Sequence, residues 1–195
     1  MCSSDLTTLA GTEVLFDGAP APVLFTLNGQ VNALAPFELA NKPNTVLQVV
    51  YNGVTSVGMT LPVVPAQPGL FTANGTGKGQ GSILNQDYSI NSASNPAAQG
   101  SAIMLFGTGG GLTDPPSTDG ALNPMPPPFG KLTLGVTATV GGQPATVLYA
   151  GPAPGLVSGI IQINVTLPSG TPSGNVPVVV QVGTASGQTV TVAVQ

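Results

Sequence analysis

Apolar and polar residues alternate along much of the chain with the period of a β-strand. Between residues 161 and 167, Ile, Ile, Val and Leu alternate with Gln, Asn and Thr, and residues 47–51, 57–63 and 190–194 behave alike. Successive side chains of a strand point to opposite faces, so each segment has one apolar and one polar face. Proline and glycine recur too often for a helix of useful length. The pattern therefore predicts an all-β protein whose antiparallel sheets pack face to face.

Short turn sequences separate these segments. Residue pairs of the types found there tolerate the positive φ angles that tight hairpins require. We expect hairpin turns at Asp17-Gly18, Asn52-Gly53, Gly141-Gly142 and Ser186-Gly187.

Two parts of the chain repeat each other. FDGAPAPVLF at residues 16–25 matches VGGQPATVLY at 140–149, QVNALAP at 30–36 matches QINVTLP at 162–168, and residues 49–63 match 180–194. Each copy spans roughly sixty residues, and such an internal repeat indicates two similar structural units. The repeat predicts two β-sandwich units in tandem.

The predicted boundary lies after residue 78, in a glycine-rich stretch, so that residues 7–78 form the first unit and 79–195 the second. Strands at 81–85 and 101–106 are expected to open the second unit, which also carries a long loop at 107–130 that is functional or mobile. The first unit has only a short lead before its repeat. We therefore expect it to be N-terminally truncated, with an exposed strand edge.

Several strings of the second unit resemble an uncharacterised C-terminal domain family of acidobacterial secreted proteins, the Solibacter-type domain. They are GGQPATVLYAG at 141–151, QINV at 162–165, PVVV at 177–180, NQDYSIN at 85–91 and FGTG at 106–109. The family is similar to the IPT/TIG immunoglobulin-like domains of cell-surface proteins and secreted enzymes. The resemblance implies immunoglobulin-like sandwiches, and it transfers no catalytic residue.

The first six residues, Met1 to Leu6, resemble a translated sequencing adapter and are predicted to be an artefact, although a natural N-terminus is the alternative. Cys2, the only cysteine, would then not be native, which leaves no disulfide or thiol chemistry.

Charged residues make up 5% of the chain, with three Lys, no His, and a net charge of −4. The isolated lysines exclude a phosphate-binding surface, so no nucleic-acid partner is expected. No apolar run reaches the ~18 residues that span a bilayer, which predicts no membrane insertion.

The absence of histidine removes the usual general base and the main zinc ligand, and the sequence predicts neither an enzyme nor a cofactor. Asp114 and Asp119 are the only close pair of carboxylates, and they are a weak Ca²⁺ candidate. A solvated loop is the favoured alternative. GTGGG at 107–111 is interpreted as a mobile or bulged turn, because a phosphate-binding loop would open a helix.

Six polar and aromatic residues are candidate ligand contacts. The Gln-x-Asn pairs recur in both copies, where they either form a polar binding strip or hydrogen-bond the neighbouring loops. Exposed aromatic rings stack on sugars, whereas Phe16, Phe25, Tyr51 and Tyr149 are expected in the core. The candidates are Gln30, Asn32, Gln162, Asn164, Tyr88 and Phe129.

These observations favour a non-catalytic structural or adhesive module, located extracellularly or on the cell surface, at the C-terminal end of a larger exported bacterial protein. The alternative is a glycan- or protein-binding accessory module of a secreted enzyme. The predicted partners are an unknown protein or glycan and upstream domains of the same chain.

Overall fold

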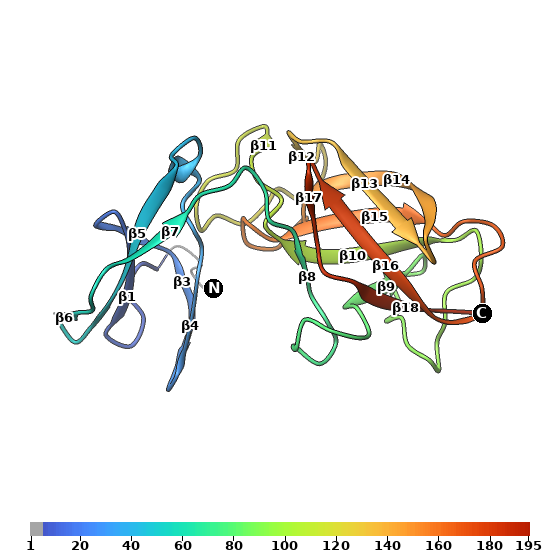
Figure 1. The fold of residues 1–195 in the computed structure, drawn as a ribbon, viewed down its shortest axis with the longest axis horizontal. Coiled ribbons are helices and arrows are strands. Elements are labelled where there is room, and N and C mark those ends of the chain that lie inside the picture. The colour runs from blue at the N-terminus through green and yellow to red at the C-terminus, as the bar shows by residue number, and fades with distance from the viewer. Residues whose placement is uncertain (1–5) are drawn as a thin grey trace.

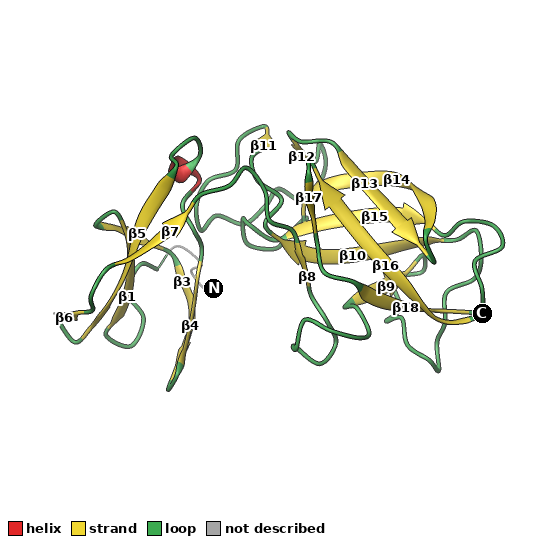
Figure 2. Cartoon of the chain, viewed as in Figure 1, coloured by secondary structure: helices red, strands yellow, loops and turns green. Residues whose placement is uncertain are grey.

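The computed structural model describes residues 6–195, which form antiparallel sheets joined by turns and loops (Figures 1 and 2). In this part of the chain the one helical element is a single 3-10 turn, η1 (Phe37–Leu39). The all-β prediction is confirmed. The prediction made for residues 1–6, including Cys2, falls on residues 1–5 and so lies almost wholly outside the described residues.

The N-terminal strands of the described chain form a five-stranded sheet and a separate hairpin. In the sheet the order is β2-β1-β5-β6, with β7 also paired to β5, while the hairpin joins β3 and β4. The strands are β1 (Thr12–Phe16), β2 (Ala19–Ala21), β3 (Val23–Leu27), β4 (Gln30–Ala33), β5 (Asn44–Tyr51), β6 (Val54–Thr55) and β7 (Met59–Pro62).

The remaining strands form a nine-stranded sheet of order β17-β16-β13-β14-β15-β10-β8, with β18 on β16 and β9 on β10, and a small hairpin of β11 and β12. The long strand β14 pairs with β13 through its first residues and with β15 through the rest, so the sheet folds into two layers. The strands are β8 (Gly69–Leu70), β9 (Ile83–Asn85), β10 (Ala102–Thr108), β11 (Thr113–Asp114), β12 (Lys131–Leu132), β13 (Val136–Val140), β14 (Gln143–Pro152), β15 (Ile161–Thr166), β16 (Gly174–Val182), β17 (Ala185–Ser186) and β18 (Val190–Val194).

The two sequence copies have the same strand pairing. The first copy (β1 to β7) pairs β1 with β5 as the second copy (β13 to β18) pairs β13 with β16, and β5 with β7 as β16 with β18. The register also agrees: Val14 lies opposite Val49, and their counterparts Ala138 and Val180 lie opposite each other. Even an irregularity recurs, because Leu24 and its counterpart Leu148 both sit where the register shifts by one residue.

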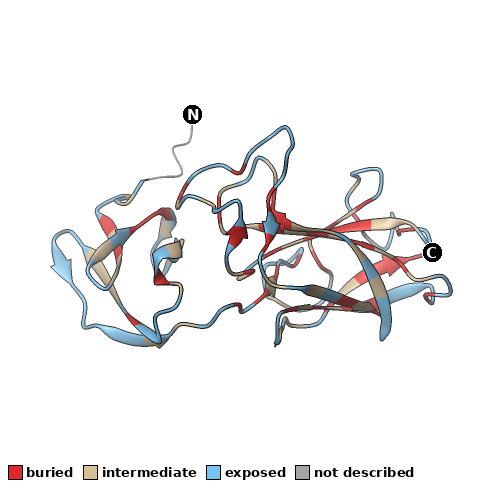
Figure 3. Cartoon of the chain, turned by 90° about the horizontal axis from the view of Figure 1, so that it is seen from above, coloured by how far each residue is buried: buried red, intermediate tan, exposed pale blue. Residues whose placement is uncertain are grey.

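The two copies differ in burial, as Figure 3 shows. Side chains of β9 and β10 join those of β15, β16 and β18 in one closed apolar core. The first copy has no equivalent of β8, β9 and β10 within residues 6–195, so its inward positions stay partly open. Met59 is 60% exposed, whereas its counterpart Val190 is fully buried. The core assignment of Phe25 and Tyr51 was wrong, because their side chains are 42% and 60% exposed.

Two further details concern a predicted boundary and a predicted turn. β8 pairs with β10, so the nine-stranded sheet includes residues that precede the boundary after residue 78, which itself stays a prediction. The turn joining β16 and β17 lies at Gly183, whereas Ser186 ends β17. The other three predicted turns have positive φ at both central residues, as tight hairpins require.

Candidate functional site

The junction between the two copies is built around the glycine-rich stretch 107–111. The Gln67 N–H donates to the Gly109 carbonyl at 2.9 Å, so the segment that leaves β7 runs directly against these glycines. A Cβ atom on Gly109 would collide with the Gln67 carbonyl, and one on Gly111 with the Pro65 carbonyl. The glycines therefore permit a close approach of two backbone segments, which is a regular use of glycine beside strands.

The long loop at 107–130 also reaches the first copy. Asp119 Oδ1 accepts a hydrogen bond from the Phe37 backbone N–H at 3.0 Å, which ties the loop to η1. On the other side, Asn123 donates to the Ala153 carbonyl at 2.9 Å, and this bond anchors the loop to the end of β14. The loop thus connects the two copies.

A cleft of about 850 Å³ lies at this junction. Its wall on the side of the second copy includes Gly109, Leu134 and Ile160. Ser158 also lines it, and the Ser158 hydroxyl is buried without a hydrogen-bond partner among the described residues. Thr45 lines the cleft from the first copy, and its hydroxyl is likewise buried without a partner among these residues. The cleft is mostly apolar, with two unsatisfied hydroxyl groups that water or a ligand would satisfy.

Inward-facing residues of the first copy form the other wall of the cleft. The cleft-lining residues of its strands occupy positions that belong to the closed core in the second copy. These residues are Phe16, Ala33, Thr45, Leu61 and Val63, and their counterparts are Val140, Val165, Val176, Val192 and Val194. The cleft therefore exists because the layer that would cover these positions is incomplete.

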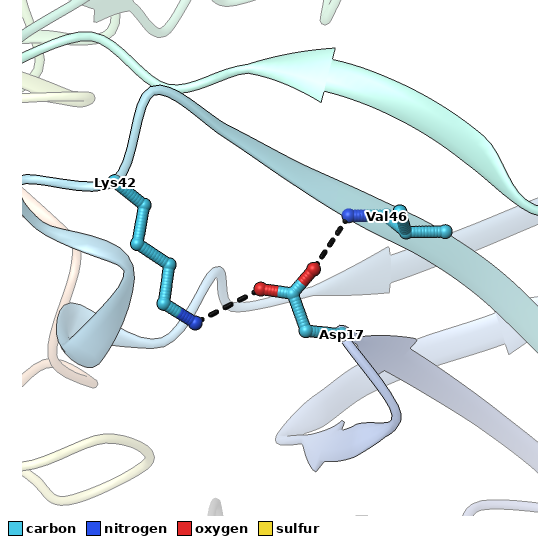
Figure 4. Close-up of polar contacts among 3 residues, drawn as sticks. All are labelled: Asp17, Lys42 and Val46. Carbon is cyan, nitrogen blue, oxygen red and sulfur yellow. Dashed lines mark hydrogen bonds and ion pairs between the residues drawn. The ribbon is translucent and has the colours of Figure 1, made fainter.

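An ion pair and a hydrogen bond link the turn between β1 and β2 to β5 and the segment before it (Figure 4). Asp17 accepts from the Lys42 ammonium at 2.9 Å and from the Val46 N–H at 2.8 Å. The bond from Val46 and then the contact with Lys42 hold the pKa of Asp17 below its ordinary value, and Asp17 in turn raises the pKa of Lys42. In the second copy the equivalent positions are Gly141 and Pro177, which have neither the carboxylate nor the N–H.

The two candidate Ca²⁺ ligands bind separate groups. Asp114 is exposed and lies 3.8 Å from the Lys131 ammonium, whereas Asp119 binds the backbone of Phe37. Within residues 6–195 no group of three or more acidic, Cys or His side chains is arranged for a metal ion. The Ca²⁺ site stays a weak prediction.

The Gln-x-Asn pairs bond within themselves. Gln30 donates to Asn32, and Gln162 donates to Asn164, in each case at 2.9 Å. The first pair is exposed and the second is half-buried between strands. The same bond within each pair indicates that these residues have a structural role that the repeat preserves. The two pairs do not contact each other, so they do not form one binding strip.

The two candidate aromatic residues lie on different loops. Tyr88 is 75% exposed in the turn after β9, with a positive φ of 66°. Phe129 is 44% exposed before β12, and its ring meets that of Tyr149 edge to face at 6.3 Å. Sequence reasoning missed the cleft, because its walls come from segments that are distant along the chain.

No helix of the described chain has the length and apolar character needed to cross a bilayer. No family model matches the chain, and a search of curated proteins found no match. Among solved structures, domains 4–9 of the surface layer protein SbsC are similar to it, with 18% sequence identity and a TM-score of 0.24. The match covers 96% of this chain and 22% of that solved chain, and a TM-score this low does not establish a shared arrangement.

Proposed function

We propose that this chain is a non-catalytic structural or adhesive module of two immunoglobulin-like β-sandwich units in tandem. It would stand on the surface of a bacterium or outside it, at the C-terminal end of a larger exported protein. The first unit would comprise the strands up to β7, and the second those from β8 onward. The strings at residues 85–91, 106–109, 141–151, 162–165 and 177–180, which resemble Solibacter-type domains, support the extracellular assignment.

The junction is the observation that carries this proposal. The two copies follow each other along the longest axis of the molecule (Figure 1). The linker, residues 63–68 between β7 and β8, and the 107–130 loop both connect them. The backbone contact between Gln67 and Gly109 and the bond from Phe37 to Asp119 would limit rotation of one unit against the other, which would give a module of defined length. That property suits a spacer between an upstream domain and its surroundings.

A replacement experiment tests the role. In the complete parent protein, residues 7–195 are deleted or exchanged for an unrelated tandem sandwich of the same length. Antibody binding to intact and permeabilised cells then measures surface display. A spacer predicts surface staining that is lost on deletion and restored by the exchange. Staining only after permeabilisation would contradict the surface assignment. Restored staining of the exchange variant together with loss of cell attachment would favour adhesion over a spacer role.

A second candidate function, ligand binding, is favoured by the cleft. Its volume of about 850 Å³ lies in the range of small-molecule sites, and the Ser158 hydroxyl offers one polar contact there. A glycan array on the full chain tests this function. Binding should disappear in Leu61→Trp, which fills the cleft, and persist in Leu148→Trp, which changes an exposed position on β14. An array without signal would remove the glycan-binding candidate.

A further inference from the structure

Strand β4 of the first copy has one unpaired edge. Within residues 6–195 it pairs with β3 alone, whereas its counterpart β15 pairs with β14 on one side and with β10 on the other. The Leu34 N–H donates to Pro22 on the β3 side. Since alternate residues of a strand point their N–H groups to opposite edges, those of Val31 and Ala33 point to the free edge.

The second copy shows what covers this edge. Strand β10 lies antiparallel to β15, with Ile103 opposite Val165 and Leu105 opposite Ile163. Ile103 and Leu105 are fully buried between the layers, together with Ile83 of β9. The same strand therefore pairs with the edge and fills the core.

The free edge lacks the protection that edge strands commonly carry. Charged side chains, proline or a cover normally prevent such an edge from pairing. The sequence LNGQVNA at residues 27–33 contains neither charge nor proline. Apolar side chains of the same copy are exposed, including Leu27 at 67% on the neighbouring strand β3 and Met59 at 60% on β7. One added strand could therefore pair with the free backbone edge of β4 and also cover exposed apolar side chains of the first copy.

We propose that the free edge of β4 binds an extended peptide segment with the chemistry of β10, which completes the first copy by pairing antiparallel to β4. The register follows from the second copy: the residue equivalent to Leu105 lies opposite Val31, and the one equivalent to Ile103 lies opposite Ala33. These two side chains enter the layer beside Met59 and the cleft beside Leu61.

A second copy of this chain is a poorer occupant of the same edge. Pairing of two β4 strands would satisfy backbone groups, but it would bring only Val31 and Ala33 toward the interior. Those side chains are much smaller than the Ile and Leu pair that fills the second copy. A strand that alternates large apolar residues matches both the edge and the space.

The test uses a peptide of residues 101–109, SAIMLFGTG, with two added lysines for solubility, and the full chain. Calorimetry measures binding, and thermal unfolding measures stabilisation. The peptide is expected to raise the lower of two unfolding transitions by about 10 °C or more at 100-fold excess over Kd, since it binds only the folded first copy. No binding at millimolar peptide would overturn the proposal.

Two controls locate the site. In the chain, Val31→Pro removes one N–H from the free edge and leaves the β3 side intact, so affinity should fall about tenfold or more. In the peptide, proline at the position of Leu105 should have the same effect with the unaltered chain, which keeps the test valid if Val31→Pro fails to fold. Equal binding by these variants would refute the assignment to β4.

Sedimentation of the chain without peptide distinguishes the other occupant. We expect a monomer whose mass does not change with Val31→Pro. A dimer that Val31→Pro or the peptide dissociates would show that a second copy occupies the edge, and the proposal would then be wrong.

Discussion

The two copies share their strand pairing, their register and a local irregularity, yet only the second has a closed core. The pairings of β1, β5 and β7 recur in β13, β16 and β18 residue by residue. The second copy is closed by β8, β9 and β10, which come from outside the repeat. Register is thus specified by alternation and turns within about sixty residues, whereas burial depends on strands supplied from elsewhere.

The largest expected difference between the copies concerns one pair of equivalent positions, Val31 in β4 and Ile163 in β15. Ile163 is fully buried, so Ile163→Ala should lower the free energy of unfolding by about 2–5 kcal/mol. Val31 is only half-buried, and Val31→Ala should cost less than about 1 kcal/mol. Urea unfolding that resolves both units measures the two losses. Equal losses would show that the first copy has a closed core after all.

A smaller difference is expected from buried asparagine. Asn91 exchanges two hydrogen bonds with the backbone of Ala193, at 2.8 and 2.9 Å, and donates to Asn85 at 2.8 Å. Asn91→Ala leaves the Ala193 N–H of β18 and the Asn85 Oδ1 without these partners, which should cost about 1–3 kcal/mol. Asn32→Ala, at an exposed site, is the matched control and should stay within about 0.5 kcal/mol. Similar losses of unfolding free energy for the two variants would mean that water replaces the hydrogen bonds of Asn91.

Local sequence signals predicted the elements that depend on local chemistry. Alternation placed most strands of both copies, and residue pairs such as Asn52-Gly53 fit their turns because both residues have positive φ. The two-residue strand β8 has no alternating pattern, so its membership of the larger sheet depends on contact with β10. Alternation also gives the face of a side chain without showing whether another layer covers it, which explains the error at Phe25 and Tyr51.

The candidate site was harder to predict. The stretch at 107–111 was interpreted as a mobile or bulged turn, and its glycines instead permit the approach of the linker. Nothing local to this stretch reveals which segment will lie against it. One usable signal was present: Asp17 and Val46 stand where the second copy has Gly141 and Pro177, a paired change that marks a contact between two positions.

The junction gives the next prediction. Gly109 has a φ of +74° and lies against the Gln67 carbonyl, so Gly109→Ala combines left-handed strain with a collision. Gly142 has a similar φ of +78° but open space around it, and Gly142→Ala should cost only the strain, about 1–2 kcal/mol. Relative to the unaltered chain, we expect small-angle scattering to show a broader range of molecular dimensions for Gly109→Ala. Gly142→Ala should leave this range unchanged. Identical profiles would mean that the linker contact does not set the junction.

The smallest expected effect is the acid response of the first copy. Folding lowers the pKa of Asp17, so its bonds to Val46 and Lys42 stabilise the first copy above the unfolded pKa of ~3.9, and this stabilisation is lost as the pH falls through the lower folded value. Both groups are exposed, so salt should weaken the effect.

Thermal unfolding between about pH 2 and 5 measures this response. Asp17→Asn should flatten the pH dependence of the first-copy transition alone. The second unit keeps its own acid response from Asp87, whose pKa is lowered by the bonds from the Ser89 hydroxyl and N–H. Because Gly141 and Pro177 replace the Asp17 contact there, Gly141→Asp should not create it: Pro177 has no N–H to donate. A first-copy transition that keeps its full pH dependence in Asp17→Asn would show that other carboxylates control it.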